Sequence, residues 1–273
     1  MNIKATCSAI ILSVFMLTSV TNAEIIATDN FNYKDGDISG KNGGQGWNTD
    51  KSGKTSWERP TNNTKIKKGQ LVTGRTSSIT RYFTKNKYSR PIKKGKIFVG
   101  LDIAATQDGK FKNGFHLVNG KGKAIAFFGT DVYQGSKVRW KISNSALSNF
   151  NNNWNLKRAV TQKDLPRSFT VPVRIVAMVD LDNNKLAFWL KDANGKFIES
   201  KPAATLDFRY DPSAGDLNKQ IAGINIGGIR DMVSDNLVVA TTFKEAAAPE
   251  PATMLLLIGG AAGVLTRRRR KNI

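Results

Sequence analysis

Short apolar runs separated by polar turns fill most of the chain between Glu24 and about Ala248. Apolar and polar residues alternate within several runs, as they do along a β-strand that buries one face. No stretch keeps a 3.6-residue apolar period long enough to predict a principal helix. Many short strands with frequent turns are typical of an all-β sandwich or barrel. The pattern predicts strands over Ile25–Thr28, Gln70–Thr73, Ile79–Phe83, Ile97–Ala104, Gly114–Val118, Ala124–Phe128, Lys137–Ile142, Phe169–Val179, Leu186–Lys191, Ala204–Phe208, Ile221–Ile226 and Leu237–Phe243.

One β-hairpin is predicted in detail, because two apolar runs flank a segment of turn-forming residues. Val173–Val179 and Lys185–Lys191 are the expected strands, and Asp180–Asn184 is the expected turn. The segment Asp180–Asn184 also puts oxygen ligands close together, so Asp180 and Asp182 are candidate ligands of a calcium ion. Their composition is ordinary for a turn, so we expect no cofactor, and calcium stays an open alternative.

The N-terminal segment Met1–Ala23 is predicted to be a secretory signal peptide and a substrate of signal peptidase. Lys4 supplies the positive start, and the apolar run Ala9–Val20 is too short to span a bilayer comfortably. Small residues precede Glu24 at the positions that signal peptidase reads, so the mature chain is expected to begin there. An N-terminal membrane anchor is the alternative.

The C-terminal segment has three parts in a fixed order. Pro249, Glu250 and Pro251 come first, the apolar stretch Ala252–Thr266 follows, and a run of cations closes the chain. Fifteen helical residues span about 22 Å, short of the roughly 30 Å of a hydrocarbon core. We therefore expect a short, transient transmembrane helix. Its cytoplasmic stop-transfer residues are Arg267, Arg268, Arg269, Arg270 and Lys271.

These three parts resemble the PEP-CTERM sorting signal, over Pro249–Lys271. The resemblance implies recognition by an exosortase in the inner membrane of a Gram-negative bacterium, with processing near Pro249–Pro251. The protein would then be released to the cell surface or to an exopolysaccharide-rich extracellular matrix. A plain tail anchor with a basic stop-transfer segment is the alternative.

Three further segments resemble LamG-like, concanavalin A-type jelly rolls: Thr28–Tyr33, Gly43–Trp47 and Ser234–Leu237. The resemblance implies an antiparallel jelly-roll β-sandwich in which the first and last strands pair. One domain would then cover residues 24–244, followed by a linker at 245–251 and the sorting tail at 252–273. The alternative is two domains, with the polar stretch Ser143–Asn155 as the linker.

The charge of the chain is strongly positive, with 42 Lys and Arg against 21 Asp and Glu. Twelve of these cations fall between Arg59 and Leu101, where no acidic residue interrupts them. Such a block attracts polyanions, which for an exported protein means acidic exopolysaccharide, lipopolysaccharide or extracellular DNA. A solvated, lysine-rich surface with no partner is the alternative. The candidate polyanion-binding residues are Lys65, Lys67, Lys68, Lys93, Lys94 and Lys96.

Sequence features that would indicate catalysis are sparse. The paired-carboxylate strand of laminarinase-type glycosidases is absent, and the single histidine, His116, is expected on an exposed strand face. Trp57 and Trp154 lie in polar, loop-like stretches and are the candidate sugar-stacking residues. The sequence therefore predicts a non-catalytic binding or structural module. The alternative is a polysaccharide hydrolase or lyase, with His116 as the candidate base of a lyase.

Overall fold

The computed structural model describes residues 23–47, 56–58, 63–74, 77–83, 92–105, 113–120, 122, 124–133, 137–143, 158–160, 172–191, 195–207, 220–228 and 232–248. Three groups of predictions lie outside these residues: the signal peptide before Ala23, Trp154, and the whole segment from Pro249 onward, including the expected C-terminal transmembrane helix. No helix within the described residues is both long and apolar enough to cross a membrane.

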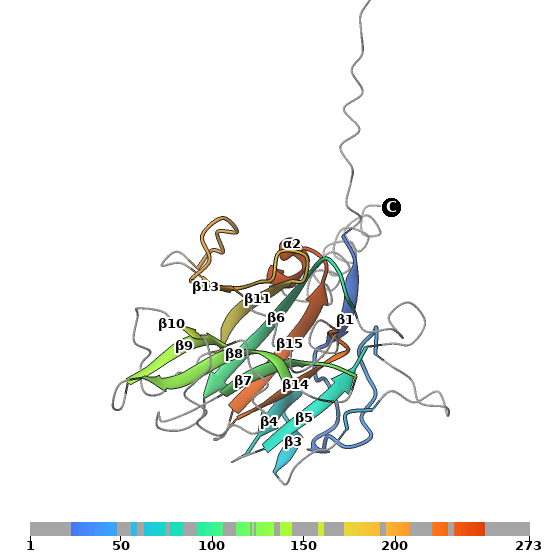
Figure 1. The fold of residues 1–273 in the computed structure, drawn as a ribbon. Helices are drawn as coiled ribbons and strands as arrows, with labels where there is room; N and C mark the ends of the chain where they lie inside the picture. Colours follow the sequence, from blue (N-terminus) through green and yellow to red (C-terminus); the bar gives the residue numbers. More distant parts are fainter. Residues whose placement is uncertain are drawn as a thin grey trace, which may run out of the picture.

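The described residues form two antiparallel β-sheets (Figure 1). In the nine-stranded sheet the order is β13-β12-β11-β6-β15-β4-β3-β2, and β1 also pairs with β15. In the six-stranded sheet the order is β10-β9-β8-β7-β14-β5. The strands are β1 (Ile25–Asp29), β2 (Gly36–Asp37), β3 (Thr64–Lys67), β4 (Gln70–Thr73), β5 (Ser77–Tyr82), β6 (Lys96–Ala105), β7 (Asn113–Val118), β8 (Ala124–Tyr133), β9 (Lys137–Ser143), β10 (Arg158–Val160), β11 (Val173–Asp180), β12 (Lys185–Leu190), β13 (Ala204–Asp207), β14 (Gly223–Gly228) and β15 (Met232–Ala240).

The first and last strands lie side by side, as the jelly-roll resemblance implied. Ile25 pairs with Ala240 and Asp29 with Leu237, while β6 lies along the other side of β15. Such pairing of distant segments separates this fold from a simple meander, in which neighbours in sequence are neighbours in the sheet. The architecture is an all-β, antiparallel jelly-roll sandwich, as predicted.

The main core lies between the two sheets and follows the alternation in the sequence. In β6, Ile97, Val99, Leu101 and Ile103 are almost fully buried and belong to this core. The intervening residues of β6 lie on the opposite face of the nine-stranded sheet, because successive side chains of a strand point to opposite sides. One strand can therefore supply two separate clusters.

A second, smaller apolar cluster lies on that opposite face and holds the only helix of the described residues, α2 (Phe243–Ala247). The Phe243 ring packs against Trp189 at 5.0 Å and Phe98 at 6.1 Å between ring centroids. The sequence predicted a strand running to Phe243, but β15 ends at Ala240 and the chain turns into α2. Trp189 is 4% exposed, and α2 helps to bury it.

Candidate functional site

The six candidate polyanion-binding lysines are all exposed. They form two groups. The first lysine group, Lys65, Lys67 and Lys68, lies on β3 and on its turn to β4. This two-residue turn has positive φ at both Lys68 and Gly69, as a type I′ hairpin turn requires. The second lysine group, Lys93, Lys94 and Lys96, lies in the segment that leads into β6.

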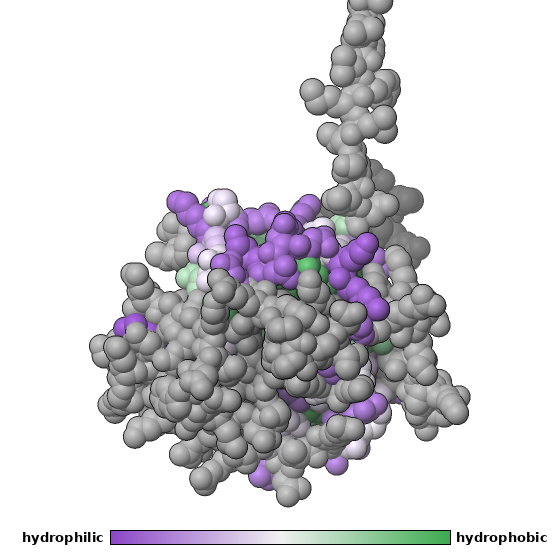
Figure 2. Space-filling view, viewed as in Figure 1, coloured by the Kyte–Doolittle hydropathy of each residue, from purple (hydrophilic) through white to green (hydrophobic). Residues whose placement is uncertain are grey.

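The two lysine groups are well separated along the strand direction. Leu71, in the β3–β4 hairpin, pairs with Ser234, and Ser234 pairs with Ile103 on its other side. Lys96 is seven residues from Ile103 on β6, which corresponds to about 23 Å of strand. The second group lies at the end where β15 runs into α2, and Figure 2 shows hydrophilic residues gathered over the end where α2 and β1 lie.

Acidic residues from distant parts of the sequence meet several cations of the acid-free segment. Arg81 is 1% exposed and forms an ion pair of 2.5 Å with Asp29. The Nζ atom of Lys96 lies 3.8 Å from the carboxylate of Asp180. The expectation of twelve cations with no opposing acid is therefore wrong in three dimensions, because the fold brings carboxylates from other strands.

Trp57 is 1% exposed, so the prediction that it stacks on a sugar is wrong. Its indole N–H donates to the Asp29 carboxylate at 3.0 Å, and the Arg81 guanidinium lies 5.4 Å from its ring centroid. The polar residues around Trp57 in the sequence suggested an exposed loop. Its partner Asp29, however, comes from β1, and the interaction takes the ring into the core.

Asp29 is the centre of a buried polar cluster at the end of β1. The Tyr33 hydroxyl donates to its carboxylate at 2.6 Å, and the backbone N–H of Phe31 donates at 2.8 Å. Burial and the neighbouring Asp29 carboxylate raise the pKa of Tyr33, so its hydroxyl remains a donor. With Trp57 and Arg81 as further partners, the cluster binds three segments of the chain together, which indicates a structural role.

Two glycines let the segment Gly43–Trp47 lie against β1 beside this cluster. A Cβ on Gly44 would lie 2.0 Å from the carbonyl oxygen of Thr28, and a Cβ on Gly46 would lie 1.8 Å from that of Ile26. Both glycines also have positive φ. Trp47 then donates its indole N–H to the Thr28 carbonyl at 2.8 Å. The segments that carry the LamG-like resemblance thus meet here as packing elements.

The predicted hairpin around Asp180 is confirmed, and its carboxylates are engaged by protein donors. Asp180 accepts hydrogen bonds from the backbone of Asp182 and from the backbone and side chain of Asn183. Asp182 accepts a bond from the backbone of Gly95 at 3.1 Å. Within the described residues no group of three or more His, Cys, Asp or Glu could hold a metal ion. Both carboxylates therefore accept hydrogen bonds from protein donors, Asp180 within the turn and Asp182 from the segment before β6.

His116 is 4% exposed, and the expectation of an exposed strand histidine is wrong. It lies on β7 between Asn225 of β14 and Phe127 of β8 in one cross-strand row, with its ring 4.9 Å from that of Phe127. Burial lowers the pKa of His116 to about 4, against the opposing effect of a hydrogen bond with Asn225. The imidazole is therefore neutral at physiological pH.

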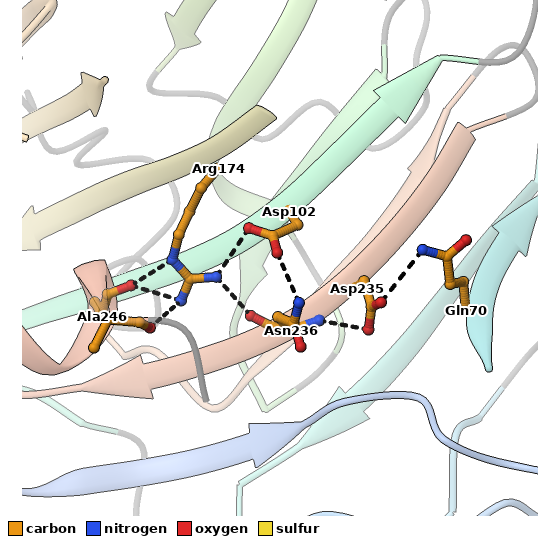
Figure 3. Close-up of polar contacts among 7 residues, drawn as sticks. Gln70, Asp102, Arg174, Asp235, Asn236 and Ala246 are labelled. Atoms are coloured by element: carbon orange, nitrogen blue, oxygen red, sulfur yellow. Dashed lines mark hydrogen bonds and ion pairs between the residues drawn. The ribbon is translucent and has the colours of Figure 1, made fainter. Parts of the chain in front are cut away.

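A second polar network, which the sequence did not reveal, lies where the chain leaves the sandwich (Figure 3). Arg174 of β11 donates to the carboxylate of Asp102 on β6 at 3.0 Å and to the carbonyl of Ala246 at 2.8 Å. Asn236, at a bulge of β15, donates to Asp102 at 2.8 Å and has a φ of 50°. The only sequence signal was the Asp235-Asn236 pair, whose turn-like character fits this bulge.

The C-terminal segment of the chain carries the signal for the protein's destination. Residues 247–270 match the PEP-CTERM protein-sorting motif. The chain carries a PEP-CTERM sorting motif. This motif indicates an exported protein with a C-terminal sorting signal, as the sequence predicted. A comparison with curated proteins finds no match.

Several solved structures are similar to the chain at low identity. The CBM2 module of the evolved Dit of Lactobacillus casei BL23 phage J-1 is 12% identical, with a TM-score of 0.45, over 80% of this chain and 95% of that one. The alginate lyase Aly36B is 12% identical, with a TM-score of 0.44, over 78% and 95%. The catalytic domain of β-agarase D from Zobellia galactanivorans is 12% identical, with a TM-score of 0.40, over 80% and 94%.

Proposed function

We propose that the protein is an exported, exosortase-sorted component of the cell surface or extracellular matrix that binds an acidic exopolysaccharide without catalysis. The sorting motif at residues 247–270 supports export and sorting. The candidate partners are signal peptidase, exosortase and the polysaccharide. The C-terminal apolar stretch would contact the inner membrane only transiently.

The exposure of all six candidate lysines carries the binding part of this proposal. A polyanion is attracted at long range by exposed cations, and it is held by several weak contacts at once. Arg81, which lies in the same acid-free segment, is buried against Asp29 and is not available to a ligand. Among the described cations of this segment, the six lysines are therefore the accessible ones, in two groups that an extended polymer could bridge.

Charge reversal tests which lysine group binds. We expect Lys65→Glu, Lys67→Glu and Lys68→Glu together to weaken retention on immobilised alginate at least tenfold, because three attractions become repulsions. Lys93→Glu with Lys94→Glu is the second arm, and Lys201→Glu, an exposed lysine in the segment before β13, is the single-site control. Undiminished retention in both arms would contradict the proposal.

Truncation tests the sorting part independently. Removal of Pro249–Ile273 should leave the protein unsorted, in the periplasm or the medium, because the sorting motif is lost. Surface retention equal to that of the full chain, measured by cell fractionation, would refute exosortase sorting.

Polysaccharide cleavage is the second candidate function. Its candidate base is His116, which is 4% exposed, so catalysis by this residue would require its imidazole to become accessible to the polymer. A lyase would generate unsaturated sugars, and a hydrolase would generate new reducing ends. Incubation with a panel of acidic and neutral polysaccharides, with His116→Gln as the matched variant, separates this function from binding alone. Product that forms with the wild type and not with His116→Gln would establish the enzyme.

A further inference from the structure

The last described residues are fixed to the sandwich by Arg174. Its Nη2 atom donates to the carbonyl of Ala246 at 2.8 Å and to that of Ala248 at 2.7 Å, and its Nε atom lies 3.3 Å from the Ala246 oxygen. Carbonyls at the end of a helix have no partner within the helix, so a charged donor placed there satisfies them. The matched sorting motif begins at Ala247, inside this contact.

Arg174 is itself held in place from the other side (Figure 3). Its Nη1 atom donates to the Asp102 carboxylate at 3.0 Å and to the Asn236 carbonyl at 3.1 Å. The Arg174 side chain is 5% exposed. The guanidinium therefore joins three strands of the nine-stranded sheet to the point where the chain leaves it.

Gly100 of β6 is a second, independent feature of the same contact. A Cβ at this position would lie 1.9 Å from the Ala246 carbonyl oxygen and 2.6 Å from Nη2 of Arg174. Only glycine leaves room for the end of α2 to lie on the sheet at this point. Gly100 of β6 and Arg174 of β11 therefore both accommodate the end of α2.

The beginning of α2 is fixed as well. The Phe243 ring is 7% exposed in the second apolar cluster. Just before it, Thr241 exchanges hydrogen bonds with Glu24: the Thr241 N–H donates to the Glu24 carbonyl at 2.9 Å, and the Glu24 N–H donates to the Thr241 hydroxyl at 2.9 Å. The segment from Thr241 to Ala248 therefore contacts the sandwich along its whole length.

We propose that Arg174 is a positioning residue for C-terminal sorting, which withholds the chain up to Ala248 from the processing enzyme. An extended strand is a common form in which proteins recognise a peptide segment. Residues 243–248 can adopt that form only by breaking the contacts above, so processing is confined to bonds after Ala248. Three residues lie between Ala248 and Ala252, so the four Cα-to-Cα steps that connect them set a reach of at most about 14 Å between the folded body and the apolar stretch.

Proteolysis by elastase, which hydrolyses bonds after alanine, tests the contact itself on the full-length protein in detergent. Arg174→Met should speed cleavage after Ala246 and Ala247 at least tenfold, with Arg174→Lys intermediate. Gly100→Ala, which leaves Arg174 intact, should have the same effect as Arg174→Met. Lys185→Met, which removes an exposed cation, is the matched control and should cleave like the wild type. Equal rates in all variants whose thermal unfolding midpoint matches the wild type would overturn the proposal.

Mass spectrometry of the protein recovered from cells tests positioning, and this arm rests on the sorting part of the proposed function. The wild type should end at one residue after Ala248, and Arg174→Met should yield several ends, some before Ala248. If the wild type and Arg174→Met have the same single C-terminal residue, the positioning role is overturned, even if the elastase experiment shows that the contact exists. A wild-type protein that keeps its full C-terminus would contradict exosortase sorting, and with it this proposal. In that case the elastase experiment still shows whether the contact between Arg174 and residues 246–248 exists.

Discussion

Trp57 and Arg81 owe their roles to Asp29, a residue that is distant from both in the sequence. Sequence neighbours suggested a sugar platform for Trp57 and a surface cation for Arg81. The fold takes both into the core, because a buried carboxylate is stabilised by donors and by a cation of opposite charge. Local composition reports the neighbours of a residue along the chain, and it contains no information on such long-range partners.

Trp57→Phe separates the structural role from a sugar-binding one. The variant keeps an aromatic ring but removes the N–H that donates to Asp29. We expect the free energy of unfolding in urea to fall by about 1–3 kcal/mol, the cost of leaving a buried acceptor with one donor fewer. Retention on immobilised alginate should be unchanged. Full stability with lost retention would restore the sugar-binding interpretation.

His116 predicts a loss of stability in mild acid. Burial lowers its pKa in the folded protein to about 4, below the ordinary value of 6.5 that the unfolded chain retains. Between these values the unfolded chain binds more protons, so stability is complete above pH 6.5 and decreases as the pH falls towards 4. From pH 7.5 to pH 5 this residue should cost about 2 kcal/mol.

Urea unfolding of the wild type and of His116→Gln at both pH values measures this contribution. The carboxyl groups titrate in both proteins, so the difference between the two isolates the histidine. The stability advantage of the wild type should shrink by about 2 kcal/mol at pH 5. A difference that does not vary with pH would show that His116 is accessible to protons in the folded state.

At the scale of elements, alternation predicted most strands within a few residues. It missed β3, in which only Thr64 and Ile66 face the core and the other two residues are lysines. It also extended the last strand into α2, because an apolar Phe243 continues the run whether it packs between the sheets or on their outer face. The turn before an apolar residue decides which of the two apolar clusters the residue joins. Thr241-Thr242 contains no glycine, proline, asparagine or aspartate, so the sequence does not mark it as a turn.

A pair of glycines tests how the first strand is held. Gly46→Ala should prevent or severely impair folding, because the new Cβ would lie 1.8 Å from the Ile26 carbonyl, and a backbone cannot yield that far. Gly40→Ala is the matched control: its φ is +74°, close to the +78° of Gly46, but no atom lies within 4 Å of the new Cβ. It should cost only about 1 kcal/mol of backbone strain. Equal soluble yields and equal urea midpoints for the two variants would contradict this account.

At the scale of the whole molecule, composition predicted the sign of the charge but not its arrangement. The described cations of the acid-free stretch form two separated lysine groups and a buried arginine. The carboxylates of Asp29 and Asp180 neutralise part of it from other strands. The sorting motif could be predicted because its parts are contiguous in sequence, whereas the Arg174 contact joins residues from β6, β11, β15 and α2.

Binding of the exported protein to alginate, titrated at 50 and 300 mM NaCl with dextran as the neutral control, tests the central claim most directly. Salt shortens the screening length from about 14 Å to about 6 Å over this range, so contacts between exposed lysines and carboxylates should weaken. The account predicts an affinity for alginate that falls at least tenfold, and no binding to dextran. Binding to alginate that is unaffected by salt, or equal binding to dextran, would contradict it.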